Sequence, residues 1–175
     1  MQCPMKKYEL NIRRAKAADS GIMADIHCRS WSAAYSGLLP EEAIRQKNAT
    51  RSALWSRLLQ TEQTGAASYF LAEMNGTPAG MISFGAYREN PTSSMGEIHA
   101  IYLLPEWFRR GIGTALLDFA MRELKKLEYQ QVCLWALSTN RNAIAFYEKN
   151  GFVQDLCKQE FIGKTVTELR YSRTL

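Results

Sequence analysis

One stretch of this 175-residue chain, residues 105–117, reads PEWFRRGIGTALL and combines residue types that suit phosphate binding. Arg109 and Arg110 can make charge-assisted contacts to phosphate oxygens, and Gly111 and Gly113 let the backbone approach a ligand closely. An apolar run ends at the proline that opens the stretch, and apolar residues at helical spacing follow the glycines. The order of strand, basic glycine turn and helix therefore predicts a phosphate cradle at a helix N-terminus, where backbone N–H groups are unpaired.

Two common phosphate-binding motifs do not match this stretch. The dinucleotide fingerprint needs a third glycine where Leu116 stands, and it also needs a βαβ unit. The P-loop needs a glycine five residues before Gly163, and Lys158 stands there. An ordinary turn, whose glycines serve only its geometry, stays open as an alternative, because short glycine motifs also occur by chance.

Residues 108–113, FRRGIG, resemble the pyrophosphate loop of the GCN5-related N-acetyltransferases, whose signature is [QR]-x-x-G-x-[GA]. Phe108 departs from that signature, since the family usually has Gln or Arg there, but the backbone cradle does not depend on it. Residues 140–152, NRNAIAFYEKNGF, resemble the second family hallmark, N-x-x-A-x-x-[FL]-Y-x-x-x-G-F. With both motifs in the family order, residues 68–155 resemble this family strongly, and the resemblance implies acetyl-CoA (coenzyme A) as the cofactor.

The resemblance also implies how the cofactor is held. Its pantetheine arm fills a gap beside the central strand like an extra strand, and its pyrophosphate meets the N–H groups of the glycine turn. Asn142 has a plainer alternative role as a solvated residue in the first turn of a helix. The implied cofactor-binding residues are Ile101, Tyr102, Leu103, Arg109, Arg110, Gly111, Ile112, Gly113, Thr114, Asn140, Asn142 and Tyr147.

The implied chemistry is direct attack of a neutral amine on a thioester. Tyr147 resembles the family's general acid for the leaving thiolate, although a core tyrosine on an amphipathic helix is the alternative. Glu97 resembles the carboxylate that many members place at the start of the central strand, and His99 has a pKa suited to proton transfer. The period of two puts Glu97, His99, Ile101 and Leu103 on one face of that strand. Structural roles for both remain open, so the base is Glu97, His99 or water.

The amine acceptor is expected near Trp31 and Tyr35, which share a helix face because they are four residues apart. Their segment resembles one in members that acetylate polyamines or other small amines, and aromatic rings also attract cations. Packing on the core is the alternative for both. Residues 41 and 42, two glutamates, can attract a cationic amine or simply start a helix. Trp135 stands where members that acetylate protein N-termini often have Glu.

Periodicity and turn signals predict the elements that position these residues. Asp19 is expected to cap the first helix, and Asn75-Gly76 to turn a hairpin. The expected strands are residues 8–14, 68–74, 79–87, 97–104, 131–136, 152–161 and 165–172, and the expected helices are residues 20–35, a short one from Pro40, 50–61, 111–126 and 140–150. This order predicts an α/β fold. The resemblance implies the acyl-CoA N-acyltransferase (GNAT-like) fold, with a mixed, mostly antiparallel sheet, helices on both faces and one N-acetyltransferase domain over residues 1–175.

Composition and charge narrow the class of protein. No apolar run reaches about 18 residues, so no transmembrane helix or membrane partner is expected. The N-terminus has no apolar segment after its lysines, and the four cysteines have no metal-ligand spacing, so we expect a cytoplasmic protein with no metal. The net charge of +5 suits a polyanion such as coenzyme A, while the scattered lysines and arginines give no reason to expect nucleic acid.

We therefore expect an acetyl-CoA-dependent N-acetyltransferase that acts on the primary amine of a small molecule, either polyamine-like or another amino compound. A homodimer is compatible with this expectation. Two alternatives stay open: a protein or peptide N-acetyltransferase, and a non-catalytic acyl-CoA-binding regulatory module on the same fold.

Overall fold

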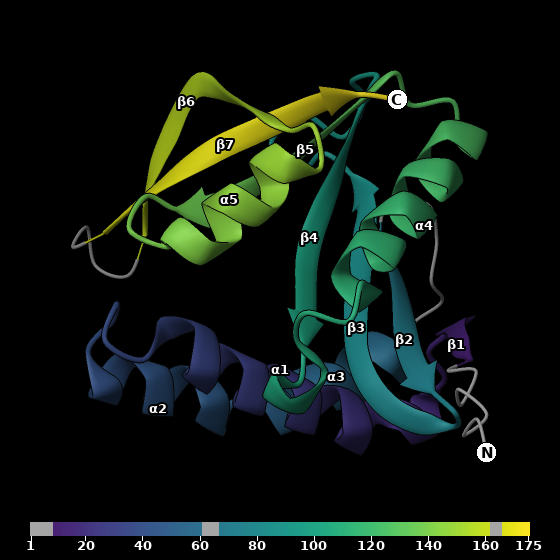
Figure 1. Ribbon diagram of the computed structural model, residues 1–175, viewed down its shortest axis with the longest axis vertical. Coiled ribbons are helices and arrows are strands. Elements are labelled where there is room, and N and C mark those ends of the chain that lie inside the picture. Colours follow the sequence, from purple (N-terminus) through teal and green to yellow (C-terminus); the bar gives the residue numbers. More distant parts are fainter. Residues whose placement is uncertain (1–8, 61–66, 162–165) are drawn as a thin grey trace, which may run out of the picture.

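The computed structural model describes residues 9–60, 67–161 and 166–175, and within these ranges seven strands form one sheet in the order β1-β2-β3-β4-β5-β7-β6 (Figure 1). The β4–β5 pair is parallel and the other pairs are antiparallel. The strands are β1 (Leu10–Arg14), β2 (Ser68–Met74), β3 (Thr77–Ala86), β4 (Met95–Leu103), β5 (Gln131–Leu137), β6 (Val153–Phe161) and β7 (Val166–Thr174). The expected mixed, mostly antiparallel sheet is confirmed.

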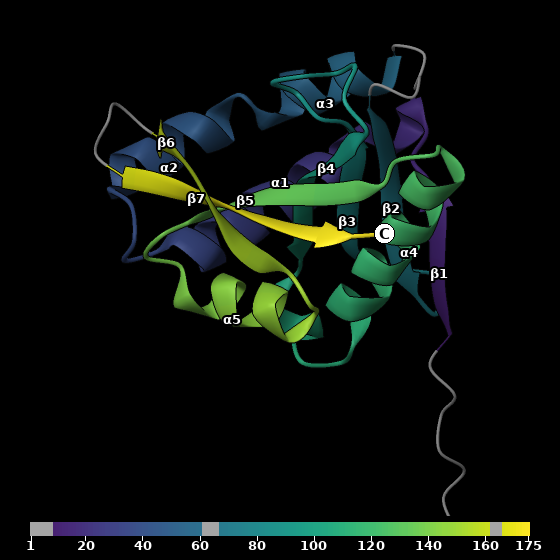
Figure 2. The same cartoon turned by 90° about the horizontal axis from the view of Figure 1, so that it is seen from above.

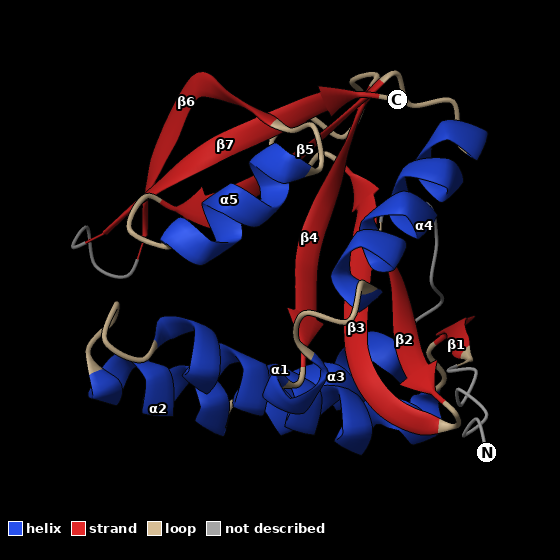
Figure 3. Ribbon diagram, in the orientation of Figure 1, coloured by secondary structure: helices blue, strands red, loops and turns tan. Residues whose placement is uncertain are grey.

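Helices cover both faces of this sheet (Figures 2 and 3). They are α1 (Ser20–Tyr35), α2 (Glu41–Ala49), α3 (Arg51–Gln60), α4 (Ile112–Lys126) and α5 (Arg141–Lys149), with short 3₁₀ turns at Ala17–Asp19 and Pro105–Trp107. One apolar cluster joins the sheet to α4 and α5, and a second joins it to α1 and α3. The sheet is thus buried on both sides, which fixes where β4 ends relative to the flanking helices.

Most expected boundaries lie within two residues of the observed ones. Asn75 and Gly76 form the β2–β3 turn with φ values of 51° and 78°, the positive values that an Asn-Gly hairpin uses. The connection between the last two expected strands lies outside the described residues, as do Tyr8, Thr61 and Thr165, which are end residues of expected elements. No helix in the described ranges is long and apolar enough to span a membrane.

Asp19 stands at the N-cap position of α1, as expected, but its side chain does not cap the helix. Its carboxylate forms no capping bond to α1 and instead accepts hydrogen bonds from Arg13, at 2.8 and 2.9 Å, and from the backbone N–H of Lys16 at 2.7 Å. The arginine, on β1, is also paired with Glu73 on β2 at 2.9 Å. The carboxylate is engaged by Arg13 and by the N–H of Lys16, so Asp19 ties the start of α1 to the edge of the sheet.

A β-bulge in β4 changes which side chains share a face. Ile98 pairs with Phe84 and Ala100 with Ser83, so His99 is an extra residue on β4. Ile98 and Ile101 consequently pack in the same cluster against α4 although they are three residues apart.

The expectation that Glu97, Ile101 and Leu103 share one face is therefore wrong. Ile101 and Leu103 face α4, while Tyr102 packs toward α1 and α3. The side chain of Glu97 alternates with that of Ile98, so it lies on the face of Tyr102. The bulge leaves His99 at the point where the alternation changes.

Candidate active site

Strands β4 and β5 separate after a short paired segment. Only Met95–Glu97 pair with Gln131–Cys133 among the described residues of the two strands, and beyond them the strands diverge (Figure 1). The facing backbone of β4 is then open to another hydrogen-bonding chain. A cavity of about 120 Å³, the gap cavity, lies here and is lined by Ala34, Tyr35, Ile98, His99, Ala100, Ile101, Tyr102, Leu134, Trp135, Asn140, Ala143 and Tyr147.

The central-strand residues that the sequence implied for the cofactor arm lie at this opening, with one difference among them. Ile101 and Tyr102 line the gap cavity, whereas Leu103 does not. The carbonyl oxygen of Leu103 accepts a 2.6 Å hydrogen bond from the hydroxyl of Ser30 on α1. This bond fixes the end of β4 against α1.

The two glycines of the turn after β4 are required for different structural reasons. Gly111 has φ of +79° and precedes α4, and a Cβ added to it would meet no protein atom within 4 Å. A Cβ on Gly113 would lie 3.1 Å from the ring of Phe146, so this glycine allows α4 to pack closely on α5. Close approach to a ligand therefore remains a reason for Gly111 alone.

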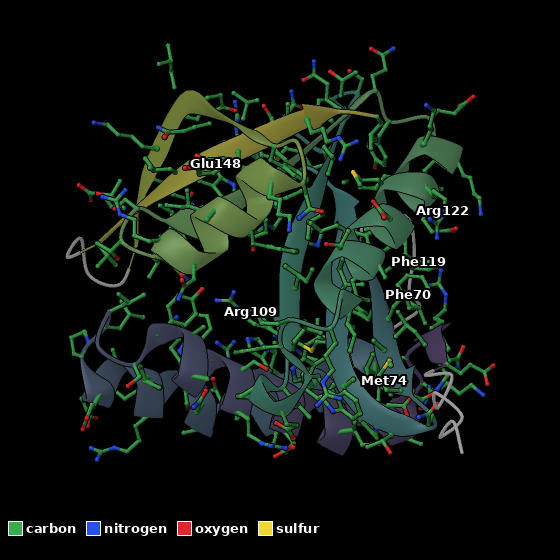
Figure 4. All side chains as sticks on the ribbon, viewed as in Figure 1. Phe70, Met74, Arg109, Phe119, Arg122 and Glu148 are labelled. Carbon is green, nitrogen blue, oxygen red and sulfur yellow. The ribbon has the colours of Figure 1, made fainter. Side chains whose placement is uncertain are left out.

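The other residues of the turn are mostly solvent-accessible. Arg109, labelled in Figure 4, has a positive φ of 60° and is exposed. Arg110 is exposed as well. The guanidinium carbon of Arg110 lies 4.9 Å from the centroid of the Trp107 ring. Thr114 is exposed in the first turn of α4, while Ile112 is buried and anchors the helix.

The second motif brings Asn140 and Tyr147 to the gap cavity but leaves Asn142 outside it. Asn140 is buried and caps α5, with Oδ1 accepting a 3.2 Å hydrogen bond from the N–H of Ala143. Tyr147, seven residues after Asn140 and within α5, also lines the cavity. Burial raises the pKa of Tyr147 above its ordinary value, and Tyr35 nearby raises it further. Asn142 is exposed and does not line either cavity.

A second cavity of about 440 Å³, the helix-side cavity, opens between the sheet and helices α1 to α3. Its volume suits a small ligand. Its lining residues are His27, Trp31, Tyr35, Lys47, Arg51, Arg88, Ile98, His99, Ala100, Tyr102, Trp135, Gln159, Glu160 and Glu168. Tyr35, Ile98, His99, Ala100, Tyr102 and Trp135 line both cavities, so the two meet at the bulge of β4.

The expected acceptor residues, Trp31 and Tyr35, are part of an aromatic wall of the helix-side cavity. Their ring centroids are 4.3 Å apart, and Tyr102 lines the same cavity. Burial raises the pKa of Tyr35 to about 12, so its hydroxyl is neutral. His27 stacks on Tyr102 at 4.6 Å and extends the wall.

His99, at the junction of the two cavities, has a defined tautomer. Its Nε2 lies 3.1 Å from the carbonyl oxygen of Ala86. A carbonyl only accepts, so Nε2 carries the proton and Nδ1 has a free lone pair in the neutral ring. Burial lowers the pKa of His99 and so favours the neutral ring. The hydrogen bond to Ala86 and the charge of Glu97 act in the opposite direction, but burial is the larger effect.

Glu97 is fully buried and lines neither cavity. Its Oε2 accepts a 2.9 Å hydrogen bond from the backbone N–H of Arg88, and its Oε1 accepts one of the same length from Nε of that arginine. A second guanidinium nitrogen of Arg88 completes the ion pair. The carboxylate is thus held on both oxygens, while the guanidinium of Arg88 lies in the wall of the helix-side cavity.

The charged side chains of the helix-side cavity were not expected from the sequence, and they come from α2, α3, the β3–β4 loop, β6 and β7. His27 alone had a signal, because it precedes Trp31 by four residues on the same helix. Glu41 and Glu42, considered for attracting an amine, are exposed and line neither cavity. Glu42 pairs with Arg45 instead.

The fold is that of the acyl-CoA N-acyltransferases. Its features are the open parallel pair of β4 and β5, the start of α4 behind a glycine with positive φ, and the aromatic helix-side cavity. The model of the Acetyltransferase (GNAT) family matches residues 24–152, and the chain belongs to this family. It is an acetyl-CoA-dependent N-acetyltransferase, as its relatives' names and fold agree.

Known proteins similar to this chain include two curated relatives and a solved structure. A probable N-acetyltransferase of Mycobacterium tuberculosis is 29% identical over 148 residues, which are 85% of this chain and 82% of the relative. A spermidine N(1)-acetyltransferase of Thermoplasma acidophilum is 25% identical over 157 residues, 87% of this chain and 94% of the relative. The crystal structure of a PaiA N-acetyltransferase from the same organism, in complex with coenzyme A, has a TM-score of 0.78 at 21% identity and covers 95% of this chain and 99% of that one.

Features of this structure fit acetyl-CoA. No protein atom lies within 4 Å of a Cβ added to Gly111, and the first turn of α4 has no acidic side chain. The gap between β4 and β5 exposes a strand edge to an amide-bearing arm. Both are backbone features, so they do not depend on the identity of the surrounding side chains.

Proposed function

We propose that this enzyme transfers the acetyl group of acetyl-CoA to the primary amine of a small molecule bound in the helix-side cavity. The observation that carries the proposal is that the two cavities meet at residues that line both of them, among them His99, Ala100 and Trp135. Acetyl-CoA supplies an acetyl thioester, and its reaction with an amine forms an amide and releases a thiol. The residues at the junction would then surround the reacting atoms.

Tyr147 is proposed as the general acid. It lines the gap cavity only, on the side where the thiol would leave, and no hydrogen bond to its hydroxyl is found among the described residues. Its raised pKa keeps the phenol protonated at neutral pH, so it has a proton to give. The backbone of residues 109–114, together with Arg109 and Arg110, is proposed to hold the pyrophosphate, and Asn140 to meet the cofactor arm.

His99 is the better proposal for the general base, ahead of Glu97. Its Nδ1 lone pair belongs to a residue that borders both cavities, and its lowered pKa leaves it neutral at pH 7. Glu97 has both oxygens occupied by Arg88 and is out of reach of either cavity. We assign Glu97 the role of fixing Arg88 and the bulge beside His99.

The acceptor is proposed to lie against Trp31, Tyr35 and Trp135. These rings line the helix-side cavity, whose volume of about 440 Å³ suits a small amine better than an extended peptide. Trp135 borders both cavities, where it narrows the approach to the junction. The similarity to a spermidine acetyltransferase also supports a small-molecule amine.

The test is the release of free thiol from acetyl-CoA in the presence of small primary amines, compared with short peptides that have free N-termini at the same concentration. Faster reaction with small amines is expected. Faster reaction with the peptides would assign the enzyme to protein substrates. Tight acetyl-CoA binding without thiol release for any acceptor would favour the alternative of a regulatory acyl-CoA-binding module.

A further inference from the structure

Arg51, the first residue of α3, is a cation without a carboxylate partner. Among the described residues no ion pair joins it to an acid, and its Nε is shielded from solvent without a hydrogen-bond partner. Its guanidinium carbon lies 4.8 Å from the centroid of the Trp31 ring. Burial lowers the pKa of Arg51, as expected for a charge removed from water without compensation.

The guanidinium nevertheless can reach a ligand. Arg51 lines the helix-side cavity, and its terminal nitrogens are not among the shielded polar atoms without partners. A guanidinium in this state has donors ready for a planar anion such as a carboxylate, which it can bind through two parallel hydrogen bonds.

His27, in the same wall, adds a second donor without an acceptor. Its Nδ1 accepts a 3.2 Å hydrogen bond from Nε1 of Trp55, so the proton of the neutral ring is on Nε2. That nitrogen has no partner in the described ranges, and the side chain is 6% exposed. Burial, and then the nearby charge of Arg51, lowers the pKa of His27 to about 3, so the ring is neutral at physiological pH.

Arg88 and Glu168, two other charged residues of the cavity, differ from Arg51. Arg88 is paired with Glu97. Glu168, on β7, accepts a 2.8 Å hydrogen bond from Gln159 and forms no ion pair with Arg51. The cavity therefore has an uncompensated cation on the α1–α3 side and a carboxylate on the β7 side.

We propose that Arg51, with His27 beside it, forms an anion subsite that binds a carboxylate group of the amine acceptor. The acceptor is then an amino-acid-like compound whose carboxylate lies toward α3 and whose amine lies toward His99. Glu168 provides a negative charge on the side of the amine. This inference rests on the proposed function, because it places the acceptor in the helix-side cavity. A polyamine would bring a cation to Arg51 and is disfavoured.

The first experiment measures acetylation of a panel of L-amino acids, each beside its carboxamide, with spermidine as a cationic reference. For the preferred side chain, kcat/KM for the acid should exceed that for the amide by about 10- to 100-fold, as expected for one charge-assisted interaction. Arg51→Gln should remove this preference while activity on the amide persists. Arg57→Gln, an exposed arginine of the same helix, is the matched control and should keep it.

A wild-type enzyme that prefers the amide or spermidine would overturn the subsite, while its activity would leave the proposed function standing. Equal losses on acid and amide in Arg51→Gln would also overturn it. If Arg51→Gln does not fold, Arg51→Lys keeps the charge and should retain part of the preference for the acid.

A second experiment does not depend on catalysis. Calorimetry should detect binding of phenylacetate at least tenfold tighter than binding of phenylacetamide to the wild-type protein, and loss of this difference in Arg51→Gln. Phenylacetate discrimination without acetylation of any amine would support the anion subsite and refute the proposed function. Equal affinities for the two probes would refute the subsite.

Discussion

The two cavities that meet at the bulge of β4 are built in different ways. The gap cavity lies where β4 and β5 separate, and it is lined by residues of both strands, of the end of α1 and of one motif, which supplies Asn140 and Tyr147. The open edge of β4 adds backbone groups that can bind a ligand. The helix-side cavity is formed by side chains from both ends of the chain, and its polar groups are charged. The first can serve any acetyltransferase of this fold, while the second can change without disturbing it.

This difference makes the effects of substitutions separable. Changes in the gap cavity should alter cofactor affinity or the chemical step for every acceptor. Changes in the helix-side cavity should alter acceptor KM and selectivity, and leave acetyl-CoA affinity unchanged. Only residues at the junction, His99 above all, should affect both. Each prediction below tests this division.

The largest effect is expected for Tyr147→Phe. Removal of the phenol should lower kcat by about 10²- to 10⁴-fold, the range for a positioned general acid, with little change in acetyl-CoA affinity. Steady-state rates and calorimetric titration of the cofactor measure the two quantities. Tyr129→Phe, at a half-buried tyrosine that lines neither cavity, should leave both unchanged. A normal kcat in Tyr147→Phe would show that Tyr147 is not the general acid.

The sequence predicted the gap cavity better than the helix-side cavity for a physical reason. The glycine turn and the Asn140 helix are local, so spacing along the chain preserves their geometry. Arg51 and Glu168 line the same cavity only because of tertiary packing, which the spacing of residues along the chain does not reveal. The bulge at His99 could not be predicted from the sequence either, because it is a change in pairing with β3 that needs no glycine or proline.

A smaller but diagnostic effect is expected at His99. His99→Gln should lower kcat by about 10²-fold and remove the acidic limb of the pH–rate profile. Activity requires the neutral ring, and because burial lowers the pKa of His99, the wild-type rate should fall only as the pH drops below about 6.5.

Glu97→Gln is the companion test, since it removes a buried charge that faces Arg88. We expect a lower melting temperature and an acidic limb that persists but moves to slightly lower pH, because the charge of Glu97 raises the pKa of His99. If Glu97→Gln removes the limb and His99→Gln does not, the base is the carboxylate, and the junction does not have the role proposed for it.

The next effect concerns the phosphate cradle. Gly111→Val should weaken acetyl-CoA binding by at least about tenfold, because valine at a positive φ is strained by about 1–3 kcal/mol and its side chain would fill the open space before α4. Calorimetry measures the affinity. Gly76→Val, at a similar φ of +78° in the β2–β3 turn, carries the same strain away from the site and should bind normally. Equal losses in the two variants would mean that the turn has no special role.

The smallest effect is expected for Tyr35→Ala, and it tests the division between the cavities most directly. Tyr35 borders both of them, yet its ring packs on Trp31 at 4.3 Å in the wall assigned to the acceptor. Aromatic contacts of this kind contribute about 0.5–1.5 kcal/mol, so acceptor KM should rise roughly 2- to 10-fold while acetyl-CoA KM stays the same. Ile22→Ala, at an exposed position of α1, controls for a general loss of helix packing. A rise in acetyl-CoA KM with unchanged acceptor KM would place Tyr35 on the cofactor side and move the acceptor wall to Trp31 and Trp135.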